Sequence, residues 1–306
     1  MLTLVTGGAG FIGSKLADRL LAEGHEVRVL DDLSAGATAN LAGDVAFIEG
    51  DITDPDVVAG AVDGVEVVFH QAARGSVARS LDAPLVTDRV NTSGTLTVLD
   101  AAHRAGVRRI VSASSSSVYG GVAPRPTVED AVLMPKSPYA VTKVAGEHYL
   151  RVYAELYDIE TVSLRYFNVY GPRQRPDSAY AAVIPRFIAA LRAGQPPGVH
   201  GDGHQTRDFA FVDDVVAANL AAATAAAGKC SGRAYNIAGG REHSLLDLLA
   251  ALEEILGVDI ASDHLAPRPG DVRHSSADLS AAVADLDYRS QVSFPEGLRR
   301  TVAWFS

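Results

Sequence analysis

A glycine-rich turn after the first apolar run is the feature that most constrains the fold. Residues 2–6 predict a strand, and residues 11–23 carry apolar side chains at helical spacing. The segment between them contains Gly7, Gly10 and Gly13, in the spacing G-x-x-G-x-x-G. At a strand-to-helix turn, Gly7 permits a tight turn, Gly10 lets the backbone approach a pyrophosphate, and Gly13 allows close helix–strand packing. The pattern predicts a βαβ unit with a phosphate-binding turn, although glycines that only form a turn give the same spacing.

Strand candidates alternate with helical stretches through the first 165 residues. Beyond residues 2–6 the apolar runs lie at 27–30, 45–48, 65–69, 109–112 and 161–164, and longer helical patterns lie near 85–105 and 138–157. This alternation predicts an α/β fold with a doubly wound parallel, Rossmann-like sheet. After Asn168 the chain is richer in glycine and proline. We therefore expect a dinucleotide-binding domain at 1–167 and a smaller mixed α/β substrate domain at 168–306. Further strands are expected at 209–212 and 235–238, so that 209–239 returns to the first domain.

Composition narrows the class of partner. The 306 residues hold 27 Lys and Arg against 37 Asp and Glu, a net charge of −10, so nucleic acid is not expected as a partner. Cys230 is the only cysteine, which excludes a disulfide framework and fits a cytoplasmic protein. The N-terminus lacks a basic segment and a cleavage site, and no apolar stretch is long enough for a membrane span. The nine histidines show no metal-binding spacing, so no metal is expected.

Polar and small residues at the predicted strand ends indicate a dinucleotide. Asp31 ends the second strand and can accept hydrogen bonds from an adenosine ribose while repelling a 2′-phosphate, which favours NAD over NADP. Asp32 can take this role instead, and either carboxylate can simply cap a turn. Further contacts are expected at the ends of the third and fourth strands, at Asp51, Ile52, Ala72 and Ala73.

A tyrosine and a lysine four residues apart give the strongest catalytic signal. Tyr139 and Lys143 share one face of a predicted helix, and Ser115 lies in a serine-rich strand end before it. A tyrosine base near neutral pH needs a pKa lowered by about 3, or ~4 kcal/mol, which the Lys143 ammonium and an oxidised nicotinamide ring can supply. Such pairs also occur on ordinary surfaces, but the glycine turn and the serine-rich strand end favour a catalytic pair.

Together these motifs resemble the extended short-chain dehydrogenase/reductase superfamily. The later stretches 70–77, 164–171, 179–185, 206–209 and 268–275 look most like its UDP-N-acetylglucosamine 4-epimerases, and the resemblance covers nearly the whole chain. It implies an NAD-dependent isomerase that epimerises C4 of a UDP-sugar through a 4-keto intermediate. It implies Ser115, Tyr139 and Lys143 as catalytic residues and adds Phe11, Ile12, Asn91 and Tyr166 to the cofactor contacts.

The same resemblance assigns the substrate contacts. It places Asn168, Arg207 and Arg268 at the diphosphate, Asp271 at the uridine ribose, and Ala182 and Val183 near the nucleotide. The hexose would be lined by Gly75, Ser76, Ser115, Asn168, Ala182 and Ser275. Guanidinium groups suit a diphosphate, although Arg207 and Arg268 can also be ordinary surface arginines.

Sugar choice depends on Ser275 and Arg74. Relatives restricted to non-acetylated sugars carry a tyrosine at the position of Ser275, so the serine leaves room for an acetamido group and favours UDP-GlcNAc and UDP-GalNAc. Plain hexoses also fit a roomy site. Arg74 replaces the apolar residue expected beside Gly75 and can meet a C6 carboxylate, which keeps UDP-glucuronic acid open.

Two other functions, that of a dehydratase or decarboxylase and that of an NAD sensor, are disfavoured by particular residues. A dehydratase or decarboxylase is disfavoured because Ser116 and Ser117 stand where dehydratases of this superfamily carry an Asp-Glu pair. A catalytically silent NAD sensor is disfavoured by the intact Ser115, Tyr139 and Lys143. The helices near 90–105 and 139–157 are expected to form a homodimer, the dimer mode of this family.

Overall fold

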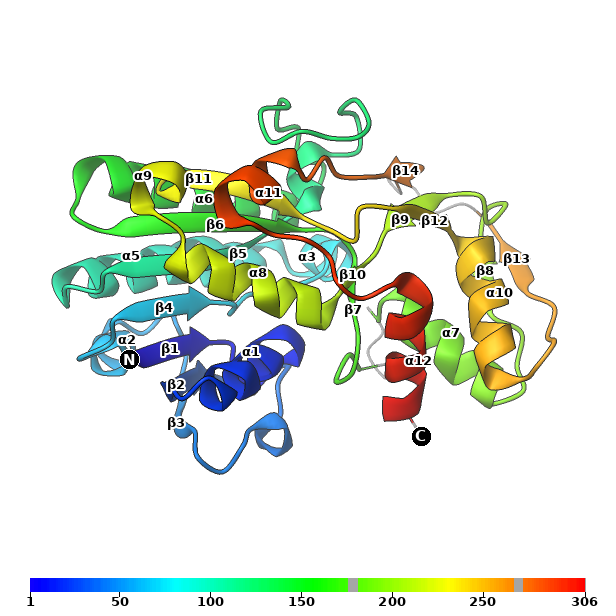
Figure 1. The fold of residues 1–306 in the computed structure, drawn as a ribbon, viewed down its shortest axis with the longest axis horizontal. Coiled ribbons are helices and arrows are strands. Elements are labelled where there is room, and N and C mark those ends of the chain that lie inside the picture. Colours follow the sequence, from blue (N-terminus) through cyan, green and yellow to red (C-terminus); the bar gives the residue numbers. More distant parts are fainter. Residues whose placement is uncertain (176–180, 267–271, 306) are drawn as a thin grey trace.

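A seven-stranded parallel sheet forms the larger lobe of the computed structural model, which describes residues 1–175, 181–266 and 272–305. The strand order is β11-β6-β5-β4-β1-β2-β3, so the chain winds outward in both directions from β1 (Figure 1). The doubly wound sheet predicted from the sequence is confirmed. Its strands are β1 (Leu2–Thr6), β2 (Glu26–Asp31), β3 (Ala46–Glu49), β4 (Val67–His70), β5 (Arg109–Ser115), β6 (Glu160–Tyr166) and β11 (Arg233–Ile237).

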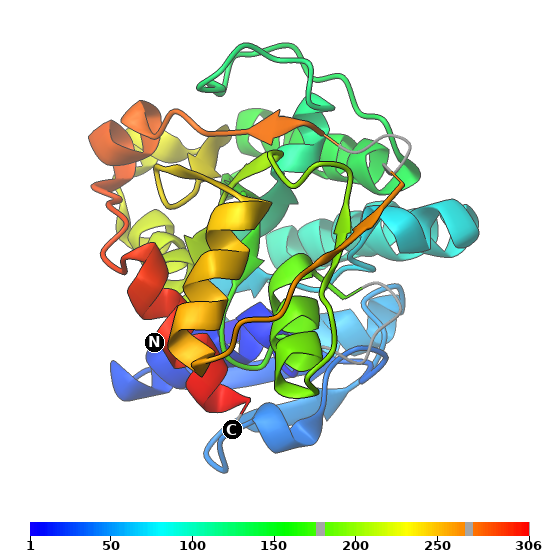
Figure 2. The ribbon, with the colours of Figure 1, turned by 90° about the vertical axis from the view of Figure 1, so that its right-hand side faces the viewer.

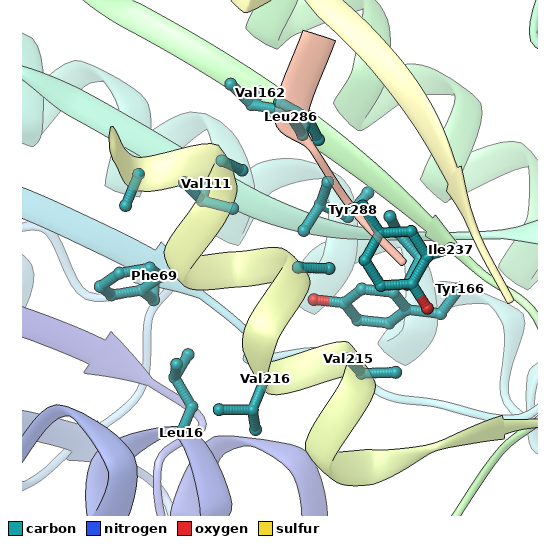
Figure 3. Packing of buried hydrophobic residues seen from close by; sticks show 14 of the residues in the cluster. Leu16, Phe69, Val111, Val162, Tyr166, Val215, Val216, Ile237, Leu286 and Tyr288 are labelled. Carbon is teal, nitrogen blue, oxygen red and sulfur yellow. The ribbon is translucent and has the colours of Figure 1, made fainter. Parts of the chain in front are cut away.

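Helices cover both faces of this sheet because successive strand side chains point to opposite sides. Val5 packs with one face and Leu4 with the other. The first face is covered by α1 (Phe11–Ala22), α8 (Val212–Thr224), α9 (Ala227–Cys230) and α11 (Ser280–Leu286), as Figure 3 shows for Leu16, Val215, Val216 and Leu286. The second face is covered by α2 (Pro55–Val62), α5 (Gly94–Arg104) and α6 (Pro138–Leu156).

Short elements connect these helices at the sheet's edges. The helical pattern predicted near 85–105 forms in three pieces, because a π-helical segment interrupts it. The pieces are α4 (Pro84–Asp88), η2 (Arg89–Ser93) and α5, and they follow α3 (Val77–Asp82). The remaining turns are η1 (Thr38–Asn40) and η3 (Ser116–Tyr119).

The smaller lobe lies beyond the carboxyl ends of the main strands (Figures 1 and 2). It has its own apolar core, built on α7 (Val183–Arg192), α10 (Leu245–Leu256) and α12 (Phe294–Trp304). Three small sheets surround these helices: β7 (Val169–Tyr170) with β10 (Ala210–Phe211), β8 (Gly198–His200) with β13 (Asp263–Leu265), and β9 (Thr206–Asp208) with β12 (Glu242–Ser244) and β14 (His274–Ser275).

The segment after residue 208 crosses between the two lobes. The strand expected at 209–212 is only β10, which pairs with β7 outside the main sheet, whereas α8 and β11 pack on and join that sheet. Asp214 lies in the first turn of α8. Its buried carboxylate accepts hydrogen bonds from Ser290 and from the amides of Gln291 and Val292, and so anchors the segment before α12.

Candidate active site

The glycine turn opens the N-terminus of α1 at the carboxyl end of β1. Gly7 has φ +69° and donates its amide to the carbonyl of Leu30 at 2.8 Å. A Cβ on Gly13 would lie 2.2 Å from the carbonyl oxygen of Gly7, so only glycine allows the helix to start this close to the strand. The tight turn and the close packing predicted from the spacing are therefore present.

A cleft of about 690 Å³ runs along the carboxyl ends of the central strands. It starts at the glycine turn, passes the ends of β2, β3 and β4, and reaches the N-terminus of α6. The predicted cofactor contacts that line it are Gly7, Gly10, Phe11, Ile12, Gly13, Asp31, Asp32, Asp51, Ile52, Ala72, Ala73, Tyr139, Lys143 and Tyr166. Gly75, Ser76 and Ala182, predicted as sugar or nucleotide contacts, line the same cleft. An elongated site at this edge of a doubly wound sheet fits a dinucleotide.

Asp31 and Asp32 differ in their surroundings. Asp31 is buried, and its carboxylate accepts hydrogen bonds from the amides of Ala9 at 2.9 Å and Leu33 at 2.8 Å. Burial raises the pKa of Asp31, while these two amides lower it. Asp32 is more exposed and pairs with the guanidinium of Arg74 at 3.3 Å. The sequence left the two carboxylates interchangeable, and the structure distinguishes their surroundings.

Asn91 lies behind the cleft and is absent from its described lining. Its buried side chain accepts a hydrogen bond from the amide of Arg74 at 2.7 Å and donates one to Thr142 at 3.0 Å. Asn91 therefore fixes the loop after β4 to the helix that carries Tyr139. This linking role depends on contacts between residues that are distant in the sequence, so the sequence pattern could not predict it.

Tyr139 and Lys143 line the end of the cleft, and Ser115, which is not part of the described lining, lies beside Tyr139. Ser137 caps α6 by accepting a hydrogen bond from the amide of Ala140 at 3.2 Å, so the helix begins at Pro138. Ser115 ends β5, and its hydroxyl lies close enough to the phenol of Tyr139 to affect the pKa of that phenol. Lys143 lies one turn along the helix, with its Nζ 5.8 Å from the centroid of the Tyr139 ring.

Burial dominates the electrostatics of this group. It raises the pKa of Tyr139, and the hydrogen bond from Ser115 lowers it only in part. It lowers the pKa of Lys143 to about 8, against the opposing charge of Glu147. The sequence predicted that Lys143 and an oxidised nicotinamide ring would together favour the phenolate. In the protein alone the pKa of Tyr139 is raised instead, because burial outweighs the effect of Ser115. The Lys143 ammonium donates a hydrogen bond to the carbonyl of Ala113 at 2.7 Å.

A buried polar network supports the catalytic helix from behind. Glu147 of α6 pairs with Arg165 of β6, with Arg165 Nη2 to Glu147 Oε2 at 2.7 Å and Arg165 Nε to Glu147 Oε1 at 2.9 Å. Ser114 donates to the same carboxylate, and Arg165 donates to the hydroxyl of Tyr119 at 2.7 Å. Sequence reasoning missed this network, although the spacing of Lys143 and Glu147 places both on one helix face.

A second cavity of about 260 Å³ adjoins the cleft, since Ala181 and Ala182 line both. It contains the predicted substrate contacts Asn168, Ala182, Val183 and Arg207. Ser275 of β14, predicted to line the hexose, is absent from the described lining of both cavities, but it is the register partner of Arg207 of β9. Arg268 and Asp271 lie outside the described residues. The lining also includes His200 and Gln205, which the sequence did not single out.

Asp208 holds the walls of this region together. Its buried carboxylate accepts hydrogen bonds from the amides of Gly240 at 3.0 Å and Ala277 at 3.3 Å. Burial raises its pKa to about 6. The backbone carbonyl of Asp208 accepts a hydrogen bond from Asn168 at 3.1 Å. This residue therefore ties the strand that carries Arg207 to the segment that follows Ser275.

Comparison with known proteins identifies the family. Residues 3–238 match the model of the NAD dependent epimerase/dehydratase family. The chain belongs to this family. It is an NAD-dependent enzyme, and the cleft lined by the glycine turn and Asp31 fits NAD. Within the described residues no cluster of His, Cys, Asp and Glu could hold a metal ion. Nor is any described helix both long and apolar enough to cross a membrane.

Similar members of the epimerase/dehydratase family include several UDP-sugar 4-epimerases. A UDP-glucose 4-epimerase of Mycolicibacterium smegmatis is 44% identical over 312 residues, covering 100% of this chain and 98% of its own length. The crystal structure of a Thermotoga maritima UDP-glucose 4-epimerase with UDP-glucose has a TM-score of 0.95 at 38% identity, covering 100% and 98% of the two chains. A UDP-N-acetylglucosamine 4-epimerase of Methanobrevibacter ruminantium, in complex with UDP-N-acetylmuramic acid, has a TM-score of 0.94 at 37% identity, covering 99% and 97%. These relatives support nucleotide-sugar 4-epimerisation as the activity.

Proposed function

We propose that this enzyme reversibly epimerises C4 of a UDP-hexose, with UDP-GlcNAc and UDP-GalNAc as preferred substrates. The observation that carries the proposal is the position of Tyr139 and Lys143 at the end of the dinucleotide cleft, with Ser115 beside Tyr139 and a second cavity that contains Arg207 next to the cleft. The cleft provides room for the cofactor, and the second cavity provides room for a nucleotide diphosphate.

In this proposal the residues of the chain move one proton and hold the substrate. Tyr139, as phenolate, takes the proton of the sugar's 4-hydroxyl and later returns it, with Ser115 sharing the hydrogen bond. The Lys143 ammonium favours the phenolate by its charge. When bound, NAD supplies the hydride acceptor and donor for C4, so that no net oxidation results. The 4-keto sugar turns about its diphosphate linkage between the two transfers.

The enzyme must hold the nucleotide diphosphate in place while the sugar turns. Arg207 lines the second cavity, and Asn168 beside it is held by the backbone of Asp208. A guanidinium suits a diphosphate because it donates parallel hydrogen bonds at fixed geometry. We assign Asn168 and Arg207 to the diphosphate, together with Arg268, and Asp271 to the uridine ribose. Ala182 and Val183 border the nucleotide.

Preference for an N-acetylated sugar rests on Ser275, a small residue beside Arg207. Ser275→Tyr is expected to reduce turnover of UDP-GlcNAc while leaving UDP-glucose turnover near its original rate, because the larger ring fills the space for the acetamido group. Ser275→Ala is the matched control and should change neither. Equal loss with both sugars in Ser275→Tyr would contradict this role.

UDP-glucose is the second candidate substrate, because two of the named relatives are UDP-glucose 4-epimerases. UDP-glucuronic acid has less support, because the Arg74 guanidinium pairs with Asp32 at the end of β2. A dehydratase remains disfavoured by Ser116 and Ser117, which follow Ser115 in η3. The intact catalytic residues likewise disfavour a silent NAD sensor.

The deciding experiment uses purified protein without added cofactor. UDP-GlcNAc, UDP-glucose and UDP-glucuronic acid are incubated separately, and the products are resolved by NMR. UDP-GalNAc as the fastest product is expected. Faster conversion of UDP-glucose would move the preference to plain hexoses. A 4-keto-6-deoxy product, or carbon dioxide from UDP-glucuronic acid, would replace epimerisation by dehydration or decarboxylation.

We also propose a homodimer. Exposed apolar side chains lie on α4, with Leu85 83% exposed, and on α6, with Leu156 71% exposed. These helices pack side by side in one protomer. The expected four-helix bundle pairs α5 and α6 with their copies, and it would remove from water the apolar surface of α6 and of α4, which precedes α5.

A further inference from the structure

An ion pair bridges the cofactor cleft at its adenosine end. Asp32 follows β2 and Arg74 follows β4, and β1 lies between these strands in the sheet. The pair, with Arg74 Nη2 and Asp32 Oδ2 3.3 Å apart, therefore spans the carboxyl end of β1, where the glycine turn begins. Both side chains line the cleft and are partly exposed.

Of the two neighbouring carboxylates, Asp32 is the one that pairs with the Arg74 guanidinium. The two oxygens of Asp31 already accept the amides of Ala9 and Leu33, and its side chain is buried. Asp32 is oriented by the amide of Ser34 at 3.0 Å on its other oxygen. Its charge is thus fixed toward Arg74.

Arg74 keeps donor capacity for a ligand. Asn91 holds its backbone amide, which fixes where the side chain starts. The buried Nε of Arg74 has no hydrogen-bond partner among the described residues. A guanidinium with a spare buried donor beside a cleft is suited to bind an anion.

The end of the second strand is where a dinucleotide-binding sheet receives the adenosine ribose. A carboxylate there accepts the 2′-hydroxyl of NAD, whereas a nearby arginine accommodates the 2′-phosphate of NADP. This chain carries both groups, paired with each other. We propose that Asp32 sets the preference for NAD by occupying Arg74, and that Arg74 is a latent ligand for a 2′-phosphate. The proposal rests on NAD as the cofactor and is independent of the sugar substrate.

The test measures which nucleotide the protein binds. Wild type, Asp32→Asn, Arg74→Leu and the double variant are each equilibrated with equal NAD and NADP, in large excess, until the nucleotide retained from purification has exchanged and the bound ratio is constant. Unbound nucleotide is removed, and the bound nucleotides are released and quantified by ion-exchange chromatography. Asp32→Asn is expected to raise the bound NADP-to-NAD ratio by roughly tenfold or more, the size of one hydrogen bond to a charged group. Adding Arg74→Leu should abolish that rise, and Arg74→Leu alone should leave NAD preferred.

Two outcomes would overturn the proposal. One is an unchanged ratio in Asp32→Asn. The other is a rise that persists in the double variant, which would assign selection to the carboxylate's repulsion alone. Asp100→Asn and Arg104→Leu are matched controls, because these residues form an exposed ion pair at 2.8 Å on α5, outside the cleft lining. Asp32→Ser repeats the test if Asp32→Asn does not fold. Failure of sugar turnover would leave this binding readout unaffected.

Discussion

Tyr139 is half-buried at the end of the cleft, and its phenolic oxygen is the group that accepts and returns the sugar's proton in the proposed reaction. Tyr139→Phe removes the hydroxyl and keeps the ring. Turnover is expected to fall by at least ~10², the usual contribution of a general acid–base group, while bound NAD stays near its original level. Tyr157→Phe, at the exposed end of the same helix, is the control and should retain full turnover. Near-normal turnover in Tyr139→Phe would refute the assignment.

A second residue-scale prediction concerns His70. This buried imidazole lies between the hydroxyls of Thr6 at 2.8 Å and Thr95 at 3.0 Å. Burial, with the charge of Lys143, lowers its pKa to about 3. Below the ordinary pKa of ~6.5, His70 binds a proton in the unfolded chain but stays neutral in the folded chain. The free energy of unfolding therefore decreases as the pH falls from ~6.5 toward 3.

The loss from His70 between pH 7 and pH 5 is about 2 kcal/mol. His70→Gln removes this titration, so its stability should decline less over the same interval. Urea unfolding at both pH values measures the difference, and His148→Gln, at an exposed position, should decline as wild type does. Parallel declines in wild type and His70→Gln would show that the imidazole is not held neutral.

Single residues also show where the sequence stops predicting. The roles of Gly7 and Gly13 follow from spacing, because backbone geometry at a strand-to-helix turn is local. Asp31 and Asp32 are neighbours with the same chemistry, and only tertiary contacts with Ala9 and Arg74 distinguish them.

At the scale of elements, α6 is held to the sheet by the buried pair of Glu147 and Arg165, whose side chains are 8% and 6% exposed. Glu147→Gln leaves the guanidinium without its counter-charge, which is expected to cost about 3–5 kcal/mol in the free energy of unfolding. Glu155→Gln is the matched control, since Glu155 pairs with Arg151 on the exposed face of the same helix.

The Glu155 control should cost less than ~1 kcal/mol. Urea denaturation of both variants measures the contrast. A loss from Glu147→Gln as small as that from Glu155→Gln would mean that the network contributes little to holding the catalytic helix.

Element prediction succeeded where one pattern dominates a segment. The main strands alternate between two apolar faces, and α6 has a serine cap followed by proline. It failed at residues 209–212, where an apolar run of strand type contains a two-residue strand and then the start of α8. A short apolar run does not have enough residues to distinguish a strand from the start of a helix. Here the pairing of β10 with β7 in the folded protein determines which residues form the strand.

The whole molecule consists of two lobes joined by contacts between residues distant in sequence. Asp214 at the start of α8 binds the amides of residues 291 and 292, and Asp208 binds that of Ala277. The return of α8 and β11 to the main sheet follows from their apolar character. The carboxylates that fix the crossing segments were not predictable, because their hydrogen-bond partners lie far away in the sequence.

The proposed homodimer yields the last prediction. Leu85→Lys with Leu156→Lys places charges on the exposed apolar faces of α4 and α6, where burial in a bundle would remove their solvation. Light scattering after size exclusion is expected to change from the mass of a dimer to that of the 32.0 kDa chain. Val132→Lys, at another exposed apolar position outside these helices, should leave the dimer intact. A dimer that survives the paired substitution would place the interface elsewhere, and a monomeric wild type would remove it.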